Sequence, residues 1–173
     1  MKIKTRLPSF VMILLLCLST LPSTAFATDD FTIQNGVLTE YTGSGGAVII
    51  PDGVTAIGDE VFSDCTNLKS VTIPGSVTEI GFEAFYACTN LTNVTISDGV
   101  STIGHSAFAL CTSLASINIP DSVAQIDQYA FWACSSLTKV TVGKGLLSIG
   151  YKAFADCTSL SNIAMSGRSN GCI

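Results

Sequence analysis

The sequence has 173 residues, of which only 12% are charged and 47% are hydrophobic. This composition does not fit a disordered chain, which combines low hydrophobicity with high charge. The sequence contains a single histidine, His105, which argues against histidine-based acid–base catalysis.

Residues 1–27 have the layout of a secretory signal peptide. Three basic residues precede an apolar run over 10–18, and small residues in Ala25-Phe26-Ala27 predict cleavage after Ala27. The apolar run is shorter than the roughly 20 residues that a membrane-spanning helix needs. The sequence therefore predicts a secreted or cell-surface protein.

The mature chain, 28–173, keeps five basic and all thirteen acidic residues, for a net charge of −8. Nucleic acids and anionic membranes are recognised by basic surfaces, so neither is expected as a partner. The remaining length suits one modest domain.

Residues 28–50 are predicted to form an N-terminal capping hairpin and a half coil. Asn35-Gly36 lies between two short apolar runs, and this dipeptide is the strongest short hairpin signal. Val48 and Ile50 precede Val71 and Ile73 by 23 residues. The segment should therefore lend a strand to the coil that follows.

Residues 51–165 consist of five copies of a 23-residue repeat, at 51–73, 74–96, 97–119, 120–142 and 143–165. Phenylalanine, cysteine, leucine and isoleucine each hold one position in every copy. The phenylalanine positions are Phe62, Phe85, Phe108, Phe131 and Phe154, and the cysteine positions are Cys65, Cys88, Cys111, Cys134 and Cys157.

Within each copy, the apolar residues follow two different spacings, one typical of a strand and one typical of a helix. Val94-Thr95-Ile96 alternates as a short strand does, whereas Ala84, Phe85 and Cys88 share one face of a helical turn. Gly81 before that turn allows a tight bend or a positive φ. One copy cannot bury its apolar residues alone, so the fold predicted is an α/β solenoid of five stacked coils.

The run I-G-x-x-A-F-x-x-C-x-x-L, followed by V-x-I-P, resembles leucine-rich repeats of the BspA-like class, found on bacterial and some protist surface proteins. The resemblance covers 51–165. It implies a leucine-rich-repeat solenoid and an adhesin-like role in binding host or neighbouring-cell proteins. No active-site residues come with the family.

The column cysteines admit three interpretations. A secreted chain with six cysteines suggests disulfides, but parallel Cβ vectors pointing into a core favour free, buried thiols. A metal site is disfavoured because paired local ligands are lacking. Cys172 lies outside the column, where an intermolecular disulfide is plausible.

No catalytic, cofactor-binding or metal site is predicted. His105 has no carboxylate or cysteine partner at i+3 or i+4, and no common nucleophile or phosphate-loop motif occurs. Asp59, Glu60 and Asp64 lack the spacing of a calcium loop. We interpret His105 and these acids as solvent-facing.

Surface aromatics are the candidate partner-binding residues, because exposed tyrosine and tryptophan often anchor interfaces. The alternative is that scattered surface aromatics are ordinary. A polar ladder on the strand face, including Thr72, Thr95, Asn118 and Thr141, is a second candidate. The aromatic candidates are Tyr86, Tyr129, Trp132, Phe82 and Tyr151.

Residues 166–173 are expected to form a short flexible tail that cannot cover the last coil. Ile163 and Met165 would then lie on an open strand, which favours self-association through the C-terminal coil.

The function predicted is a non-enzymatic binding module for an extracellular protein or glycan. The alternatives are an inert spacer or fragment of a larger surface protein, and an accessory module of an exported enzyme.

Overall fold

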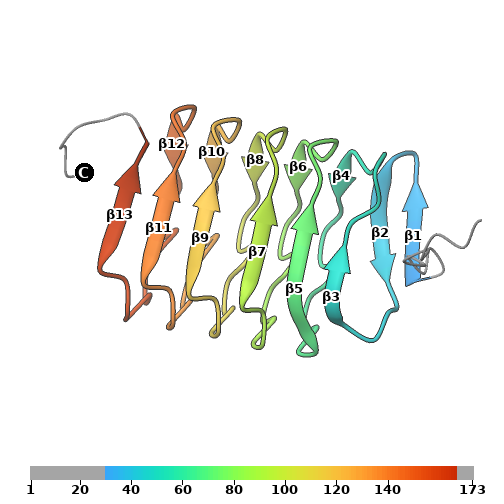
Figure 1. The fold of residues 1–173 in the computed structure, drawn as a ribbon, viewed down its shortest axis with the longest axis horizontal. Coiled ribbons are helices and arrows are strands. Elements are labelled where there is room, and N and C mark those ends of the chain that lie inside the picture. The colour runs from blue at the N-terminus through green and yellow to red at the C-terminus, as the bar shows by residue number, and fades with distance from the viewer. Residues whose placement is uncertain (1–29, 167–173) are drawn as a thin grey trace, which may run out of the picture.

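The computed structural model describes residues 30–166, so the expected signal peptide and Cys172 lie outside the described residues. Within this range the chain winds into a solenoid whose coils lie side by side (Figure 1). Each coil passes through a short strand, a turn segment and a longer strand. The solenoid predicted from the 23-residue columns is confirmed.

The longer strands form one face of the solenoid, here called the long-strand face (Figure 1). Neighbouring strands pair in parallel, mostly between positions 23 residues apart, as in Val71 opposite Val94. Gly46 lies opposite Leu68 instead, and the strands at 93–96 and 116–119 form no ladder with each other. These strands are β3 (Gly46–Ile49), β5 (Leu68–Ile73), β7 (Asn93–Ile96), β9 (Ser116–Ile119), β11 (Lys139–Val142) and β13 (Asn162–Met165).

The short strands form a second sheet that begins with a hairpin. Its order is β1-β2-β4-β6-β8-β10-β12, and only β1 and β2 pair antiparallel. The members are β1 (Phe31–Gln34), β2 (Val37–Tyr41), β4 (Ala56–Ile57), β6 (Glu79–Ile80), β8 (Thr102–Ile103), β10 (Gln125–Ile126) and β12 (Ser148–Ile149).

The predicted N-terminal hairpin turns at Asn35 and Gly36, which have φ values of 52° and 82°. Two central residues with positive φ are typical of the type I′ turn that matches strand twist. β2 then pairs in parallel with β4, so the hairpin lies directly against the first coil. β3 supplies the strand expected before β5, with Val48 opposite Val71.

The α part of the predicted α/β repeat needs correction, because no helix lies in the repeats and the turn segments replace it. Every turn segment contains two residues in the left-handed region, four positions apart, such as Glu83 (φ 49°) and Ala87 (φ 53°). A left-handed residue costs an L-amino acid about 1 kcal/mol. The fold must therefore recover that cost elsewhere.

Hydrogen bonds between coils provide the compensation. The backbone N–H groups of Glu83, Phe85 and Ala87 donate to the carbonyls of His105, Ala107 and Ala109 in the next coil, at 3.0, 2.8 and 2.9 Å. The same three positions donate in the first, third and fourth copies. We call this arrangement the turn ladder. A helix would direct these N–H groups along its own axis and leave neighbouring coils unjoined.

The glycine that precedes the turn in four of the five copies lies close to the preceding coil, and its φ is not positive. Asp127 holds this position in the fourth copy. A Cβ at Gly104 would lie 2.6 Å from the carbonyl oxygen of Ile80 in the preceding coil. The positive φ expected there occurs two residues later, at Ser106 (φ 54°).

A stack of aromatic rings runs through the core. Phe85, Phe108 and Phe131 are fully buried, and consecutive rings lie nearly parallel with centroids 5.0 and 5.3 Å apart. Tyr41 and Phe31 extend the stack into the hairpin, with Tyr41 4.8 Å from Phe62. The hairpin therefore covers the apolar end of the first coil.

Phe108 occupies the middle of this stack, so its truncation tests the register of the coils. Phe108→Ala should lower the free energy of unfolding by about 3–5 kcal/mol, as removal of a buried aromatic does. Urea unfolding followed by circular dichroism measures the change. A loss below about 1 kcal/mol would contradict the stacked core.

Candidate binding surfaces

Five rings from four successive coils form a row on the turn side, here called the aromatic strip. Phe82 stacks on His105 at 5.3 Å, and His105 meets Tyr129 edge-on at 5.7 Å. Tyr129 in turn contacts Tyr151 at 5.8 Å and Trp132 at 6.5 Å. The rings therefore form one connected surface rather than scattered aromatics.

The strip is continuous because in one coil the neighbouring residue supplies the ring. Phe82, His105 and Tyr151 share a repeat position, but the fourth copy has Gln128 there. Tyr129, one residue later, supplies the ring instead, at a left-handed residue with φ 59°. Its ring contacts both His105 and Tyr151, which closes the gap.

His105 is a member of the strip that sequence reasoning did not include. It is only partly exposed, and its Nδ1 is buried without a hydrogen-bond partner among the described residues. The interpretation as a solvent-facing histidine is therefore corrected. The signal was its repeat position, which it shares with Phe82 and Tyr151.

The C-terminal half of the strip has polar partners. Trp132 Nε1 donates a 2.6 Å hydrogen bond to Asp156 Oδ2, and Lys152 Nζ lies 5.3 Å from the Tyr151 ring centre. Tyr151 is 63% exposed and Phe82 38% exposed, whereas Tyr129 and Trp132 are partly buried. The strip thus combines fixed rings with accessible ones.

The structure brings together four of the five predicted aromatic residues. Tyr86 shares a repeat position with Trp132, but the coil between them has the buried Ala109 there. No ring contact joins Tyr86 to the strip in the described part of the chain. Tyr86 is thus a natural control residue for the strip.

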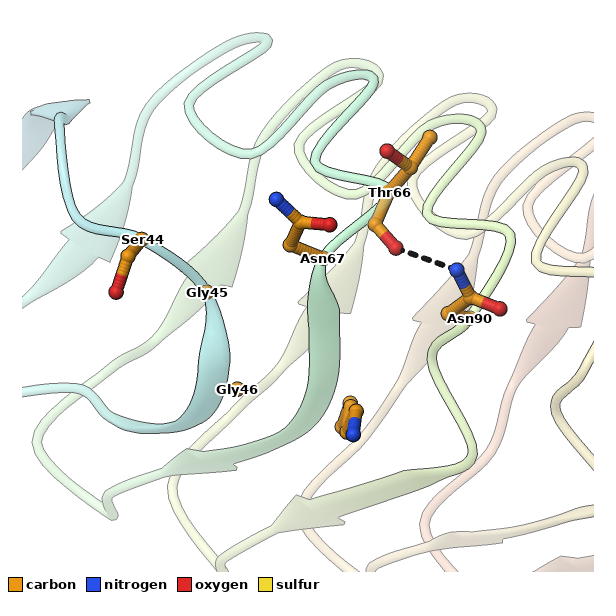
Figure 2. A pocket seen from close by; sticks show the side chains of 7 residues that line it. Ser44, Gly45, Gly46, Thr66, Asn67 and Asn90 are labelled. Atoms are coloured by element: carbon orange, nitrogen blue, oxygen red, sulfur yellow. Dashed lines mark hydrogen bonds between the residues drawn. The ribbon is translucent and has the colours of Figure 1, made fainter.

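The long-strand face carries several shallow clefts. One, of about 350 Å³, lies where the loop before β3 meets the next coil, between Gly45 and Asn67 (Figure 2). Asn90 Nδ2 donates to the carbonyl of Thr66 at 2.7 Å beside this cleft, and Lys69 also lines it. Gly45 is needed there, because its φ is 85° and a Cβ would lie 2.6 Å from the backbone of Asn67.

The five column cysteines are free. Each thiol from the second copy onward donates to the carbonyl oxygen of the phenylalanine 26 residues before it, as Cys111 does to Phe85 at 3.2 Å. The corresponding distances for Cys88, Cys134 and Cys157 are 3.0, 3.1 and 3.1 Å. The thiols thus act as buried donors that link the coils.

Burial also lowers the reactivity of the thiols of Cys88 and Cys111. Desolvation raises the pKa of Cys111 from its ordinary value of 9.0 to about 12, and it raises the pKa of Cys88 as well. A thiol that stays protonated at neutral pH is a poor nucleophile. Among residues 30–166 no group of three potential ligands is placed to hold a metal ion.

A family model for the BspA-type leucine-rich repeat region matches residues 32–168 in six copies. The chain belongs to the BspA-type leucine-rich repeat family. The six copies are one more than the five full repeats found from the columns, since the match begins inside the hairpin. No curated protein matches the chain.

Solved structures of bacterial leucine-rich repeat proteins resemble the chain. A leucine-rich cell surface protein from Faecalibacterium prausnitzii is 37% identical, with a TM-score of 0.72 over 76% of this chain and 35% of that one. A leucine-rich repeat protein from T. pallidum is 36% identical, with a TM-score of 0.74 over 78% of this chain and 68% of that one. The chain thus spans about a third of the first protein and two thirds of the second.

The pneumococcal vaccine antigen PcpA shares the fold alone, at 19% identity and a TM-score of 0.70 over 80% of this chain and 35% of that one. Within residues 30–166 of this BspA-type chain, no helix has the length and apolar character to cross a membrane.

The raised thiol pKa values predict alkaline destabilisation. Between pH 9 and 12 the native thiol of Cys111 stays protonated while the unfolded thiol ionises, so stability falls as pH rises. Each such thiol contributes about 1.4 kcal/mol per pH unit. Urea unfolding at pH 8 and pH 10.5 should show the fall, and Cys111→Ala should show a smaller one. An equal fall in both proteins would contradict this role of Cys111.

Proposed function

We propose that the protein is a secreted or cell-surface, non-enzymatic module that binds an extracellular protein or glycan through the aromatic strip. The observation that carries this proposal is the continuity of the strip across four coils. Aromatic side chains provide large contact area at low entropic cost, and they dominate many interfaces. Binding here would make and break no covalent bond.

The scaffold suits such a role because it fixes the rings before a partner arrives. Residues of the strip come from different coils, and the turn ladder sets the spacing between those coils. A surface that is ordered in advance loses less entropy on binding. The half-buried Tyr129, contacted by rings on two sides, is the centre of this arrangement.

The location outside the cell draws support from two sources. The F. prausnitzii structure is described as a cell surface protein, and its repeats are 37% identical to these. The sequence of residues 1–27 is the independent argument, since it has the layout of a secretory signal. The negative charge of the mature chain favours a neutral or basic partner over a polyanion.

The aromatic strip can be tested with paired variants. Immobilised chain 28–173 should capture a partner from extracellular extracts, and Tyr129→Ala combined with Tyr151→Ala should reduce capture at least tenfold. Tyr86→Ala is the matched control, because Tyr86 lies outside the strip, and it should leave capture unchanged.

The only tryptophan provides a second measurement. Trp132 is partly exposed, so its emission should shift when a partner covers the strip. Equal capture by the strip variant and the control, with no emission change, would favour an inert spacer. Copurification with a hydrolase would instead favour an accessory module.

A second copy of the chain is a further candidate partner, at the last described coil. Ile149 and Ile163 are 40% and 42% exposed, and Phe154 is only partly buried. Within residues 30–166, β13 pairs with β11 alone, so its other edge is available for strand pairing. We propose that two chains associate through this end.

Sedimentation velocity tests that association directly. The chain should show a dimer whose fraction rises between about 1 and 100 μM, following mass action. Ile163→Lys places a charge on the exposed strand and should give a monomer, whereas the distant control Thr95→Lys should not. A monomer at 100 μM for the unchanged chain would contradict the proposal.

A further inference from the structure

The long-strand face is divided into two sheets. β3, β5 and β7 form one ladder, and β9, β11 and β13 form another, with no ladder between β7 and β9. The coils of β7 and β9 are nevertheless joined elsewhere. β6 pairs with β8, and the turn ladder joins Phe85 to Ala107 at 2.8 Å. The interruption, here called the seam, is therefore local to the long-strand face.

The residue that precedes each strand explains one half of the seam. Thr92 donates through both its N–H and its hydroxyl to Lys69 of the previous coil, at 2.9 and 3.0 Å. The N–H and hydroxyl of Thr138 likewise donate to the carbonyl of Ala115, and those of Ser161 donate to the carbonyl of Thr138. Ala115 has no hydroxyl, and its N–H donates to no backbone carbonyl in the described chain.

The residue that follows each strand explains the other half. The N–H groups of Ser97, Gly143 and Ser166 donate to Ile73, Ile119 and Val142 of the preceding coils, at 3.0, 2.8 and 2.7 Å. Pro120 holds this position after β9. Proline has no N–H, so it cannot make the equivalent bond to Ile96.

These two contacts flank three junctions, β5/β7, β9/β11 and β11/β13, and both are missing at β7/β9. Proline alone does not open a junction, because Pro74 follows β5 while β3 and β5 remain paired. The combination of Ala115 and Pro120 therefore accounts for the seam.

The seam contains a cleft of about 240 Å³ with an uncharged polar lining. Its exposed side chains are Asn93, Thr95, Ser116 and Asn118, above the buried Val94 and Ile96. A second cleft, of about 360 Å³, shares Ile96 and Asn118 with it and extends past Pro120 to Asp98 and Asp121. The two clefts adjoin each other at Ile96 and Asn118, and the second also reaches Gly143 and Ser166 of the following coils.

We propose that this seam is a binding site for a neutral, hydroxyl-rich ligand, a glycan chain. Amide and hydroxyl side chains can both donate to and accept from sugar hydroxyls. The strand edges add backbone groups that no ladder occupies. A protein partner would be expected to find an aromatic or apolar anchor, and the exposed lining offers none. An acidic glycan is disfavoured by Asp98 and Asp121.

The site deepens the proposed binding function but does not depend on the aromatic strip, so the two can fail separately. Ala115→Thr with Pro120→Ser restores both missing contacts with residues found at the same positions in other copies. The pair should close the seam. Thr92→Ala with Ser97→Pro removes the hydroxyl contact to Lys69 and the N–H contact to Ile73 at β5/β7, and it should open a second seam there.

Native-state hydrogen exchange measures whether the seam is open. Amides of β7 and β9 should exchange faster than those of β5 and β11, and the closing pair should slow them about tenfold. The opening pair should accelerate exchange in β5. Equal protection of all four strands in the unchanged chain would overturn the proposal.

An array of neutral and acidic oligosaccharides tests the ligand. The chain should bind neutral members, and the closing pair should reduce that binding at least tenfold. Asn118→Ala, at an exposed residue, should weaken it without altering the fold. If the double variant Tyr129→Ala with Tyr151→Ala still binds neutral oligosaccharides, the glycan site is the seam and not the aromatic strip.

Three results would overturn the glycan site: no binding to neutral oligosaccharides, binding to acidic members alone, or binding unchanged by the closing pair and by Asn118→Ala. Loss of glycan binding in the aromatic variants alone would support the strip and reject the seam.

Discussion

The backbone hydrogen bond from one coil to the next is the constraint on which the structure depends. In the turn segments it joins residues 22 positions apart, as from Phe85 to Ala107 at 2.8 Å. Such a bond can repeat only if every coil has the same length, and the columns of the sequence keep a constant spacing of 23 residues. Glu83 and Ala87, whose N–H groups donate to the next coil, both adopt left-handed conformations.

The side-chain columns follow from this spacing rather than causing it. Rings held one coil apart stack at 5.0 Å between Phe85 and Phe108, and the thiol of Cys111 reaches the carbonyl of Phe85. A residue fits the core only if its copy in the next coil fits beside it. The core is thus quasi-one-dimensional, because each side chain packs mainly against the equivalent side chains of the neighbouring coils.

This dependence explains what the sequence could and could not predict. The phenylalanine and cysteine columns predicted the solenoid, because repetition at a fixed period leaves few other ways to bury apolar faces. The turn was taken for a helical one because Ala84, Phe85 and Cys88 satisfy a helical face, while left-handed residues such as Glu83 and Ala87 belong to types that do not favour that conformation. His105 was missed because its partners are rings in adjacent coils, and the seam because it arises from two departures, at Ala115 and Pro120, that matter only together.

The two candidate surfaces meet at one junction. Between the second and third copies the long-strand face has no ladder, so the turn ladder, the pairing of β6 with β8 and the contact of Phe82 with His105 join the coils there. The stacked rings of Phe82 and His105 therefore belong to the contacts that hold together the two coils whose longer strands form no ladder.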